Sequence, residues 1–229
     1  MSFFKRYSYA LPVSLSAIAY AGVRSRQSIR CSSTGSIWRE ANPNAPRASP
    51  YPLVFIRTPE SWGEDPKGWQ STEGLLLEKG YGCLEITCDE HQGETSKEIL
   101  KKMADDVQQR IRLAAIPFPP VVFARGLGTL VAETHISDYP VSGVVLINPP
   151  YTDTKDNKSP NEKALPSPVE PFNYEAFPRI AVVDELKNVE QLEKHRLANT
   201  DADLIMYSGE YGQQQSLYEI ERWLDDKGF

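Results

Sequence analysis

The sequence predicts a three-layer α/β domain built on a mainly parallel sheet of about six strands. From Leu53 onward, short apolar runs rich in β-branched residues alternate with longer amphipathic stretches, which is the pattern of βαβ units. Hydrophobic residues make up 40% of the 229 residues, which is enough for a packed core. Charged residues make up 24%, and no run reaches the roughly 18 apolar residues that a membrane-spanning helix needs. We therefore expect a soluble domain without a transmembrane segment.

The predicted elements alternate along the domain. Strands are expected at 53–56, 83–87, 121–124, 143–147, 180–183 and 204–207. Helices are expected at about 66–79, 96–114, 127–137, 189–197 and 214–227. In the second helix, Ile99, Met103, Val107 and Ile111 recur at four-residue spacing, which predicts one buried stripe. Residues 151–177 are rich in proline, have no period, and are expected to form a long irregular excursion.

The N-terminal segment differs from the rest of the chain in charge. Residues 1–39 contain six basic residues and no acidic one, so they carry +6. The remainder has 25 − 6 = 19 basic and 31 acidic residues, a net charge of −12. An acidic domain of this kind argues against nucleic acid as a partner, because neutralising phosphates takes clustered Lys and Arg.

We interpret residues 1–39 as a mitochondrial presequence that is disordered or partly helical, because they are rich in Ser and Arg and lack acids. A secretory signal is the alternative, with Lys5 and Arg6 before an apolar run and Ala19-Tyr20-Ala21 as a cleavage site. The later Arg24, Arg26 and Arg30 oppose export and favour the mitochondrial matrix. Residues 30–33 are expected to hold the processing site. Residues 40–52, with four prolines, are expected to be a linker before a domain at 53–229.

Ligands of a parallel sheet bind where the strands end at their carboxyl edge. The loops at that edge are expected at 57–63, 88–93, 124–128, 148–151, 184–187 and 208–212. In the third of these, a strand runs into a helix through Arg125-Gly126-Leu127-Gly128. Val131 stands where a dinucleotide fingerprint needs its third glycine, and no Lys-Ser/Thr pair follows as in a phosphate loop. The shape instead fits a nucleophile elbow.

Several motifs in the expected order resemble the α/β-hydrolase family over most of the chain after Pro52. The runs are PLVFIRTPESW, LLLEKGYGCLEITCD, FARGLGTLVA, DYPVSGVVLINPP, FPRIAVVD and YSGEYG before a helix with Trp223 and Leu224. The resemblance implies an α/β-hydrolase-like fold. Two N-terminal strands usual in the family are expected to be missing, and so is a helical cap.

The family mechanism needs a serine at the elbow, a histidine, an acid and an oxyanion loop. On this chain the resemblance places the nucleophile at Gly126, which has no side chain, and the histidine at Tyr211 or Gly212. Asp184 stands at the acid position, although it could equally cap the following helix. The oxyanion loop is Arg57-Thr58. We therefore expect no catalytic residues of the ordinary triad.

Other reactive residues lie outside these positions. We expect His135 and His195 to be solvent-facing or incidental, and His91 to be the only histidine at a carboxyl-edge loop. A relocated site of Asp89, His91 and Ser96 is a minor alternative, because these residues lack an elbow. The three cysteines form neither a disulfide framework nor a zinc site, and Cys83 and Cys88 are expected to be buried free thiols on opposite faces of the sheet.

Three functional hypotheses follow. The first is a mitochondrial α/β-hydrolase-like protein without serine-hydrolase activity that binds or assembles other molecules. The second is an enzyme with a rebuilt site, in which Arg57, Arg125, Tyr211 and Glu210 converge, with Thr58 and Leu127 beside them, to hold a small carboxylate or phosphate anion. Structural pairing of both arginines with Asp89, Asp184 or Glu210 is the alternative interpretation.

The third hypothesis is a subunit of a mitochondrial protein complex. Four aromatic residues of the 151–177 excursion could dock on a protein partner or pack on their own domain, namely Tyr151, Phe172, Tyr174 and Phe177. No cofactor and no metal site is expected.

Overall fold

The computed structural model describes residues 29–31, 35–63, 67–150, 164–169, 172, 174, 179–193, 195–209 and 211–229. They form one sheet of eight strands in the order β1-β2-β4-β3-β5-β6-β7-β8. The strands are β1 (Ile29–Cys31), β2 (Ser36–Arg39), β3 (Leu53–Arg57), β4 (Cys83–Thr87), β5 (Val121–Arg125), β6 (Gly143–Ile147), β7 (Ile180–Glu185) and β8 (Asp203–Tyr207). The six from β3 to β8 pair with one another in parallel, as predicted.

The N-terminal end of the sheet corrects two expectations. β1 pairs with β2, and β2 pairs with β4, both antiparallel, so the two N-terminal strands are short but present. Residues 29–31 and 36–39 therefore belong to the folded domain and not to a disordered presequence. The error arose because these strands are three and four residues long and contain Arg30 and Arg39, so they lack the apolar pattern of the central strands. Residues 1–28 and 32–34, the rest of the expected presequence, lie outside the described residues.

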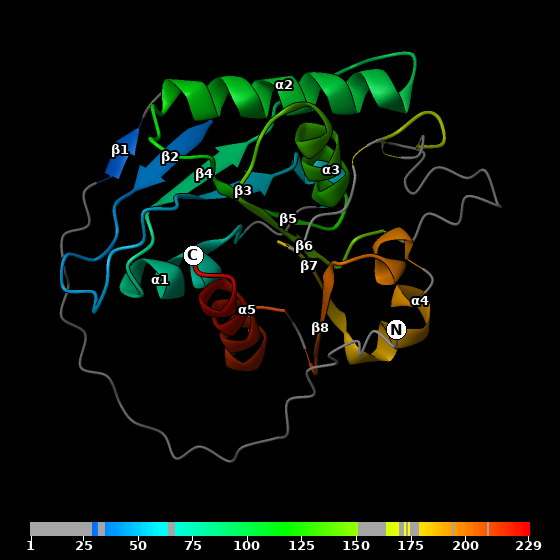
Figure 1. The fold of residues 1–229 in the computed structure, drawn as a ribbon. Helices are drawn as coiled ribbons and strands as arrows, with labels where there is room; N and C mark the ends of the chain where they lie inside the picture. The colour runs from blue at the N-terminus through cyan, green and yellow to red at the C-terminus, as the bar shows by residue number, and fades with distance from the viewer. Residues whose placement is uncertain are drawn as a thin grey trace.

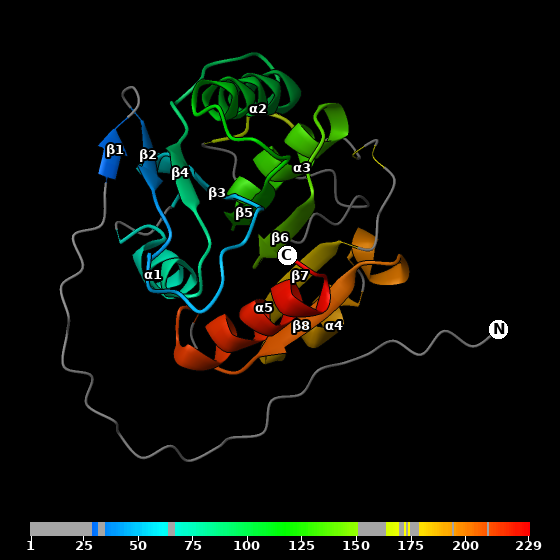
Figure 2. The same cartoon turned by 60° about the vertical axis from the view of Figure 1, so that its left-hand side comes forward.

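Helices cover both faces of the sheet (Figures 1 and 2). Helices α2 (Ser96–Leu113) and α3 (Gly128–Asp138) lie on one face, and α1 (Gln70–Glu78) and α5 (Gln214–Asp226) lie on the other. The short α4 (Val189–Leu192) follows β7 and packs on the α2 face. Three short 3₁₀ turns complete the description, at Glu60–Trp62, Leu186–Asn188 and Arg196–Asn199. This is the predicted three-layer arrangement.

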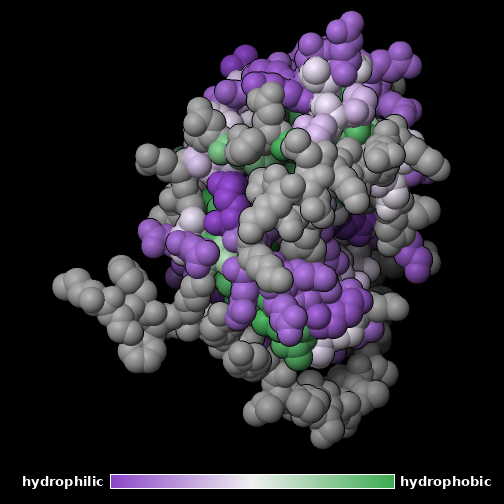
Figure 3. All heavy atoms as spheres, turned by 90° about the vertical axis from the view of Figure 1, so that its right-hand side faces the viewer, coloured by the Kyte–Doolittle hydropathy of each residue, from purple (hydrophilic) through white to green (hydrophobic). Residues whose placement is uncertain are grey.

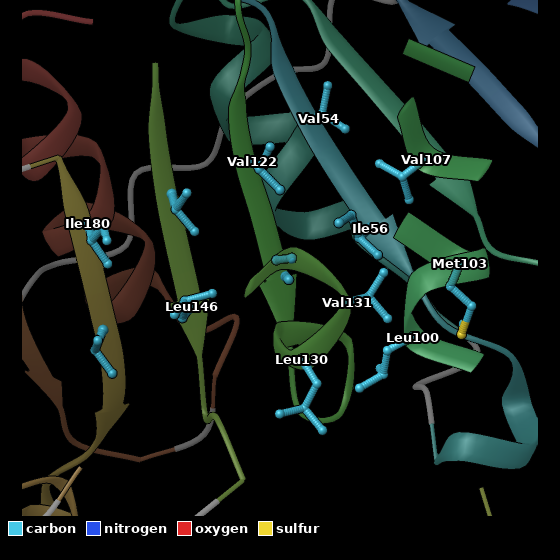
Figure 4. Close-up of a cluster of buried hydrophobic side chains, with 14 of the residues drawn as sticks. Val54, Ile56, Leu100, Met103, Val107, Val122, Leu130, Val131, Leu146 and Ile180 are labelled. Carbon is cyan, nitrogen blue, oxygen red and sulfur yellow. The ribbon is translucent and has the colours of Figure 1, made fainter. Parts of the chain in front are cut away.

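Alternation along the strands builds two hydrophobic cores. Val54 and Ile56 point to the α2 face, where they meet the predicted stripe of α2 and side chains of α3 (Figure 4). Phe55 points to the other face and packs against Trp69 and Phe123. Cys83 and Cys88 are buried free thiols in different cores, so the prediction that they face opposite sides is confirmed.

The chain between β2 and β3, predicted as a linker, has no helix or strand but is fixed to the domain. The amides of Asn42 and Ser49 donate to the carbonyls of Leu77 and Gly80 at 3.0 Å each. Gly80 has φ +95, and a Cβ there would lie 1.9 Å from a backbone oxygen of the linker. Only glycine therefore allows the linker to pass so close to the end of α1.

The described part of the 151–177 excursion contains no helix, which agrees with the expected absence of a cap. Ser167 is tied to the start of α2, since its Oγ accepts from the Ser96 amide at 2.9 Å and its amide donates to the Ser96 Oγ at 3.0 Å. Leu165 is fully buried in the core of the α2 face. The excursion thus completes that core.

Two aromatic residues of the excursion pack on their own domain. The hydroxyl of Tyr174 donates to the buried Glu133 of α3 at 2.7 Å. Arg196 also donates to Glu133, at 2.6 Å, and its guanidinium lies over the rings of Phe172 and Tyr174. Tyr151 and Phe177, the other two aromatics of this hypothesis, lie outside the described residues. The packing that we see is therefore internal.

Three further observations concern the surface, the helices and possible metal sites. Where its residues are coloured, the face in Figure 3 is mostly hydrophilic, and hydrophobic residues are visible only as small separate areas. Within the described ranges, the helices are too short or too polar to cross a bilayer. In the same ranges, no three His, Cys, Asp or Glu side chains are grouped so that they could hold a metal ion.

Candidate functional site

The turn between β5 and α3 has the geometry of a nucleophile elbow with glycine at its apex. Gly126 has φ +53, a left-handed conformation that side chains rarely adopt. Its amide donates to the Ile147 carbonyl at 2.9 Å, and its carbonyl accepts from the amide and the hydroxyl of Thr129 at 3.1 and 2.7 Å. A Cβ at Gly126 would meet no atom within 4 Å. The turn is therefore held in place and faces open space.

A pocket of about 280 Å³ lies in front of this turn, at the carboxyl edge of the parallel strands. Its lining residues come from the loops after β3, β5, β6 and β8 and from the strand ends. They are Thr58, Trp62, Gly63, Arg125, Gly126, Leu127, Ile147, Asn148 and Tyr211. A pocket thus lies where the binding crevice was expected. Its lining brings together four of the predicted residues, Thr58, Arg125, Leu127 and Tyr211.

Arg125 is the charged residue of this lining. It is the last residue of β5, and its guanidinium carbon lies 4.9 Å from the ring centroid of Trp69. Trp69 is 1% exposed, and its indole Nε1 donates to the Ile56 carbonyl at 3.0 Å. A guanidinium over a fixed tryptophan face gains a cation–π attraction. The stacked ring therefore limits where the positive charge can lie.

Tyr211, which the resemblance placed with Gly212 at the histidine position, lines the pocket with a phenol that cannot act as a base. Its hydroxyl lies 2.9 Å from the Thr72 hydroxyl, and its ring packs edge-on to Trp69 and Tyr207. Burial raises the pKa of the Tyr211 phenol above its usual value, although the bond to Thr72 and the charge of Arg125 both oppose the shift. The phenol is therefore neutral at physiological pH. Glu210 lies outside the described residues.

Asn148 contributes an oriented amide. It follows β6 directly and has φ +46, and its Oδ1 accepts from the Tyr207 hydroxyl at 2.9 Å. Because the oxygen is committed to that bond, the Nδ2 donors are turned away from Tyr207. The sequence signal for this residue was its place in a carboxyl-edge loop, but no role was predicted for it. Trp62 was missed in the same way.

Arg57 does not join the pocket, which corrects the expected pair of arginines. Its Nη1 lies 3.6 Å from Glu85 Oε1, on the face of the sheet under α1. Glu85 was not among the predicted partners. Because β3 places residues 53, 55 and 57 on the α1 face, Arg57 meets the charged residue of the adjacent strand. Thr58, one residue later, is 3% exposed and lines the pocket.

Asp184 is buried but does not line the pocket. β7 continues to Glu185, so Asp184 lies within the strand and not in the loop after it. Its Oδ1 accepts from the Glu185 amide at 2.6 Å and from the Asn188 Nδ2 at 2.8 Å. These contacts hold the Asp184 carboxylate against the Glu185 amide and the Asn188 side chain; neither bond goes to the backbone N–H of a residue in α4.

None of the three histidines is among the lining residues of the pocket. His135 is fully buried, not solvent-facing, and its Nε2 lies 3.1 Å from Gln108 Oε1. His195 is partly buried and accepts from the Leu197 amide through Nδ1 at 3.3 Å. Burial lowers the pKa of each of these two imidazoles to about 4. Both are neutral structural groups near pH 7.

The relocated site of Asp89, His91 and Ser96 is not assembled. His91 Nε2 lies 2.5 Å from Asp106 Oδ2, and Arg110 contacts Asp89 at 2.6 Å. Ser96 is fully buried against Ser167. Each of the three side chains has a different partner. Asp89 and His91 contact residues of α2, and Ser96 contacts Ser167 of the excursion.

A cluster of charges that the sequence did not predict joins β2, β4 and α1. Arg39 Nη1 contacts Glu73 Oε2 at 2.6 Å and Glu85 Oε2 at 3.1 Å. Glu73 is 1% exposed, and its Oε1 has no hydrogen-bond partner. Burial raises the pKa of Glu73 to about 7; the Arg39 charge opposes this shift and the Glu85 charge adds to it. Glu73 follows Thr72, whose hydroxyl meets Tyr211, so one turn of α1 serves both the cluster and the pocket.

The comparisons with known proteins identify the fold. No family model and no curated protein matches the sequence. The structure of apo esterase 2 from Thermogutta terrifontis aligns with a TM-score of 0.61 and 10% identity over 93% of this chain and 98% of that one. The same esterase phosphonylated by sarin aligns at 0.58.

An α/β-hydrolase enzyme from the metagenome of lagoon sediments of Mar Chica, Morocco, also aligns, with a TM-score of 0.58 and 10% identity over 88% of this chain and 100% of that one. At such identities the likeness concerns the fold alone. The chain therefore has an α/β-hydrolase-like fold, as the motifs implied.

Proposed function

We propose that this protein is a ligand-binding member of the α/β-hydrolase-like fold that does not hydrolyse esters. The observation that carries the proposal is the elbow pocket with Gly126 at its apex. The pocket and the left-handed turn are present, but the apex has no nucleophile and no histidine lines the described pocket. Losing either the nucleophile or its base removes nearly all of a triad's contribution to rate.

The remaining hydroxyls of the pocket do not replace the serine. Thr58 is nearly buried, and the raised pKa of Tyr211 keeps its phenol protonated. A nucleophile of this type needs an adjacent base to become reactive. What the pocket retains is the capacity to bind, and binding is the function we assign.

The test is labelling with a fluorophosphonate probe. Thermogutta terrifontis esterase 2 serves as the positive control, since it has the same fold and is phosphonylated by sarin. Under conditions that label the esterase fully, we expect no labelling of this protein above its heat-denatured sample. Labelling that depends on the folded state would refute the proposal.

The other two hypotheses are less well supported. A rebuilt enzyme site would need Arg57 and Arg125 in the pocket, but Arg57 contacts Glu85 and does not line the pocket. A protein-binding surface on the excursion would need exposed aromatic side chains, but Phe172 and Tyr174 pack against Arg196 of the same domain. A binding pocket requires neither feature, so we favour it.

We further propose that residues 1–28 direct the protein to mitochondria. They contain Lys5, Arg6, Arg24 and Arg26 and no acid. Processing within residues 30–33 would remove or split β1, so we place the cleavage before Ile29. Residues 1–28 fused to a fluorescent protein should bring it into mitochondria. A fusion that stays in the cytosol, or that enters the secretory pathway, would contradict this assignment.

A further inference from the structure

The sheet ends at β8, and the outer side of this strand lies next to a groove. β8 is the last strand in the sheet order, and among the described residues no strand pairs with its outer side. Figures 1 and 2 show β8 at the margin of the sheet with α5 beside it. A groove of about 420 Å³ is lined by residues 203–205 of β8 and by side chains between Glu219 and Lys227 along α5. β8 thus presents a strand edge beside an open groove.

The pairing of β7 decides which backbone groups of β8 face outward. A backbone amide of the loop after β6 donates to the Val183 carbonyl, so the backbone groups of Val183 are turned toward β6. Those of Val182 and Asp184 are therefore turned toward β8. Their register partners on β8 are Leu204 and Met206. In a parallel ladder the bonds run to the residues on either side of a register partner, so the N–H and C=O groups of Leu204 and Met206 face outward.

β8 lacks the features that keep sheet edges from pairing. Proteins protect such edges with proline, lysine, bulges, inward-pointing charges or very short strands. Residues 204–207 are Leu, Ile, Met and Tyr, and all five residues of β8 stay in register with β7, so the strand has no bulge. At the opposite edge, β1 has only three residues and contains Arg30. Of the two edges of the described sheet, β8 is the one suited to further pairing.

Four of the five charged residues that line the groove are paired within the chain. Asp203 contacts Lys227 Nζ at 2.6 Å, and the buried Glu219 contacts Arg222 at 3.1 Å. Asp226, the fifth, lies exposed at the end of α5. A strand that enters beside β8 therefore meets ion pairs. Such a groove suits a strand with an uncharged centre, which β8 itself has, better than a charged peptide.

We infer that two copies of this chain associate through β8, in antiparallel pairing about a two-fold axis at Ile205. Leu204 of one copy then faces Met206 of the other, and each such pair exchanges two backbone hydrogen bonds. This register satisfies every outward donor and acceptor of both strands. An axis at Leu204 or at Met206 would need residue 202 or residue 208, which lie outside β8.

The two-fold arrangement also places the groove of each copy against the other. The axis is perpendicular to the joined sheet, so both α5 helices lie on the same face and meet across it. Each copy offers the same surface to the other, which is the arrangement of the commonest oligomers of soluble proteins. The inference goes beyond the proposed function and does not depend on it, because the elbow pocket lies elsewhere on the sheet.

The first measurement is sedimentation velocity of the full chain over a range of protein concentrations. We expect a dimer that dissociates on dilution. Met206→Pro removes one outward N–H from each copy, and an edge strand tolerates proline where that N–H faces outward. The loss of both hydrogen bonds should raise the dissociation constant of the dimer at least about tenfold. The melting curve of the variant shows whether it remains folded.

Two cysteine variants test the register even where Met206→Pro does not fold. At the axis, the Cα atoms of a non-hydrogen-bonded pair lie about 4.5 Å apart, within the range of about 4.4–6.8 Å found in disulfides. Ile205→Cys should therefore link the two copies under mild oxidation. Both variants also carry Cys31→Ser, and Cys83 and Cys88 are buried.

Met206→Cys is the matched control. Met206 is as buried as Ile205, but in this register it lies two residues along the strand from its own copy. The two Cα atoms are then about 8 Å apart, too far for a disulfide. We expect no link between the copies of this variant.

The inference would be overturned by a full chain that stays monomeric at every concentration, or by a dimer that a folded Met206→Pro variant leaves intact. A dimer in which Ile205→Cys fails to link, or in which Met206→Cys links instead, would overturn it as well. None of these outcomes bears on the fluorophosphonate test. A labelled protein that forms this dimer would refute only the lack of hydrolysis, and an unlabelled monomer would refute only the dimer.

Discussion

Gly126 shows how a single residue separates the shape of a site from its chemistry. The turn has φ +53 and is held by hydrogen bonds to Ile147 and Thr129, while the residue at its centre has no side chain that could react. This could be read in part from the sequence, because strand, glycine turn and helix follow one another there. The open space at the apex, however, depends on chains from other loops and could not be read.

Gly126→Ser tests this separation directly. The side chain meets no atom within 4 Å, so the cost comes from the left-handed backbone and should be about 1–2 kcal/mol of unfolding free energy. We expect a folded variant that hydrolyses p-nitrophenyl acetate no faster than the unaltered protein, because no histidine lines the described pocket. Urea denaturation measures the unfolding free energy, and a burst assay measures the hydrolysis of p-nitrophenyl acetate.

Gly228→Ser is the control for the backbone cost, since Gly228 has φ +75, open space and no place in the pocket. The two variants should lose similar stability. A burst of product from Gly126→Ser would mean that a base reaches the apex after all.

Glu73 predicts a dependence of stability on pH. Its pKa of about 7 in the folded protein lies above the ordinary glutamate value of 4.5, so the folded state holds the proton more tightly. The stability from this group is fully present below pH 4.5 and is lost as pH rises through 7. The loss between pH 5 and 8 should be about 2–3 kcal/mol.

Glu73→Gln keeps the shape of the protonated side chain and cannot titrate. We expect its unfolding free energy to match the unaltered protein near pH 5 and to exceed it at pH 8. Denaturation with urea at both pH values measures the difference. An identical pH dependence in the two proteins would contradict the shifted pKa.

At the scale of elements, the central sheet was predictable and its N-terminal edge was not. The six parallel strands were placed within one or two residues of their observed ends, because buried parallel strands are short apolar runs. β1 is the edge strand, and β2 lies between β1 and β4. Both are only three or four residues long, so the local sequence does not show their pairing. The same limit applies to Arg39, whose partners Glu73 and Glu85 are distant in sequence.

The role of these strands can be tested by comparing a chain that begins at residue 29 with one that begins at residue 40. The first retains β1, β2 and Arg39 and should be as stable as the full chain. The second leaves Glu73 and Glu85 without Arg39, and breaking a buried pair costs about 3–5 kcal/mol. Urea denaturation of the two chains measures this difference in unfolding free energy. Equal stability of the two chains would mean that the N-terminal strands add nothing.

At the scale of the whole molecule, buried titratable groups define a pH range for the fold. The pKa values of His135 and His195 are lowered to about 4, so the stability from these groups is present above their usual value near 6.5 and is lost as pH falls toward 4. Glu73 acts in the opposite direction as pH rises through 7. Together the three groups predict that stability falls below about pH 6.5 and changes little between pH 6.5 and 8.

This prediction is checked by melting temperatures from pH 4.5 to 8. Each histidine should contribute a loss of about 2 kcal/mol on the acid side. A variant with His135→Gln and His195→Gln should lose less stability than the unaltered protein between pH 6.5 and 4.5. An equal or larger loss of stability between pH 6.5 and 4.5 in the double variant would contradict the lowered pKa values of the two histidines.

The positions of the tryptophans give the molecule an optical property. Trp62 lines the pocket, and Trp69 lies under the Arg125 charge, whereas Trp223 on α5 donates to Asp203 on β8, away from the pocket. A ligand that enters the pocket changes the polarity beside Trp62 and the surroundings of the Arg125 guanidinium over Trp69. Intrinsic fluorescence should therefore respond to occupancy of the pocket in a folded, unlabelled protein.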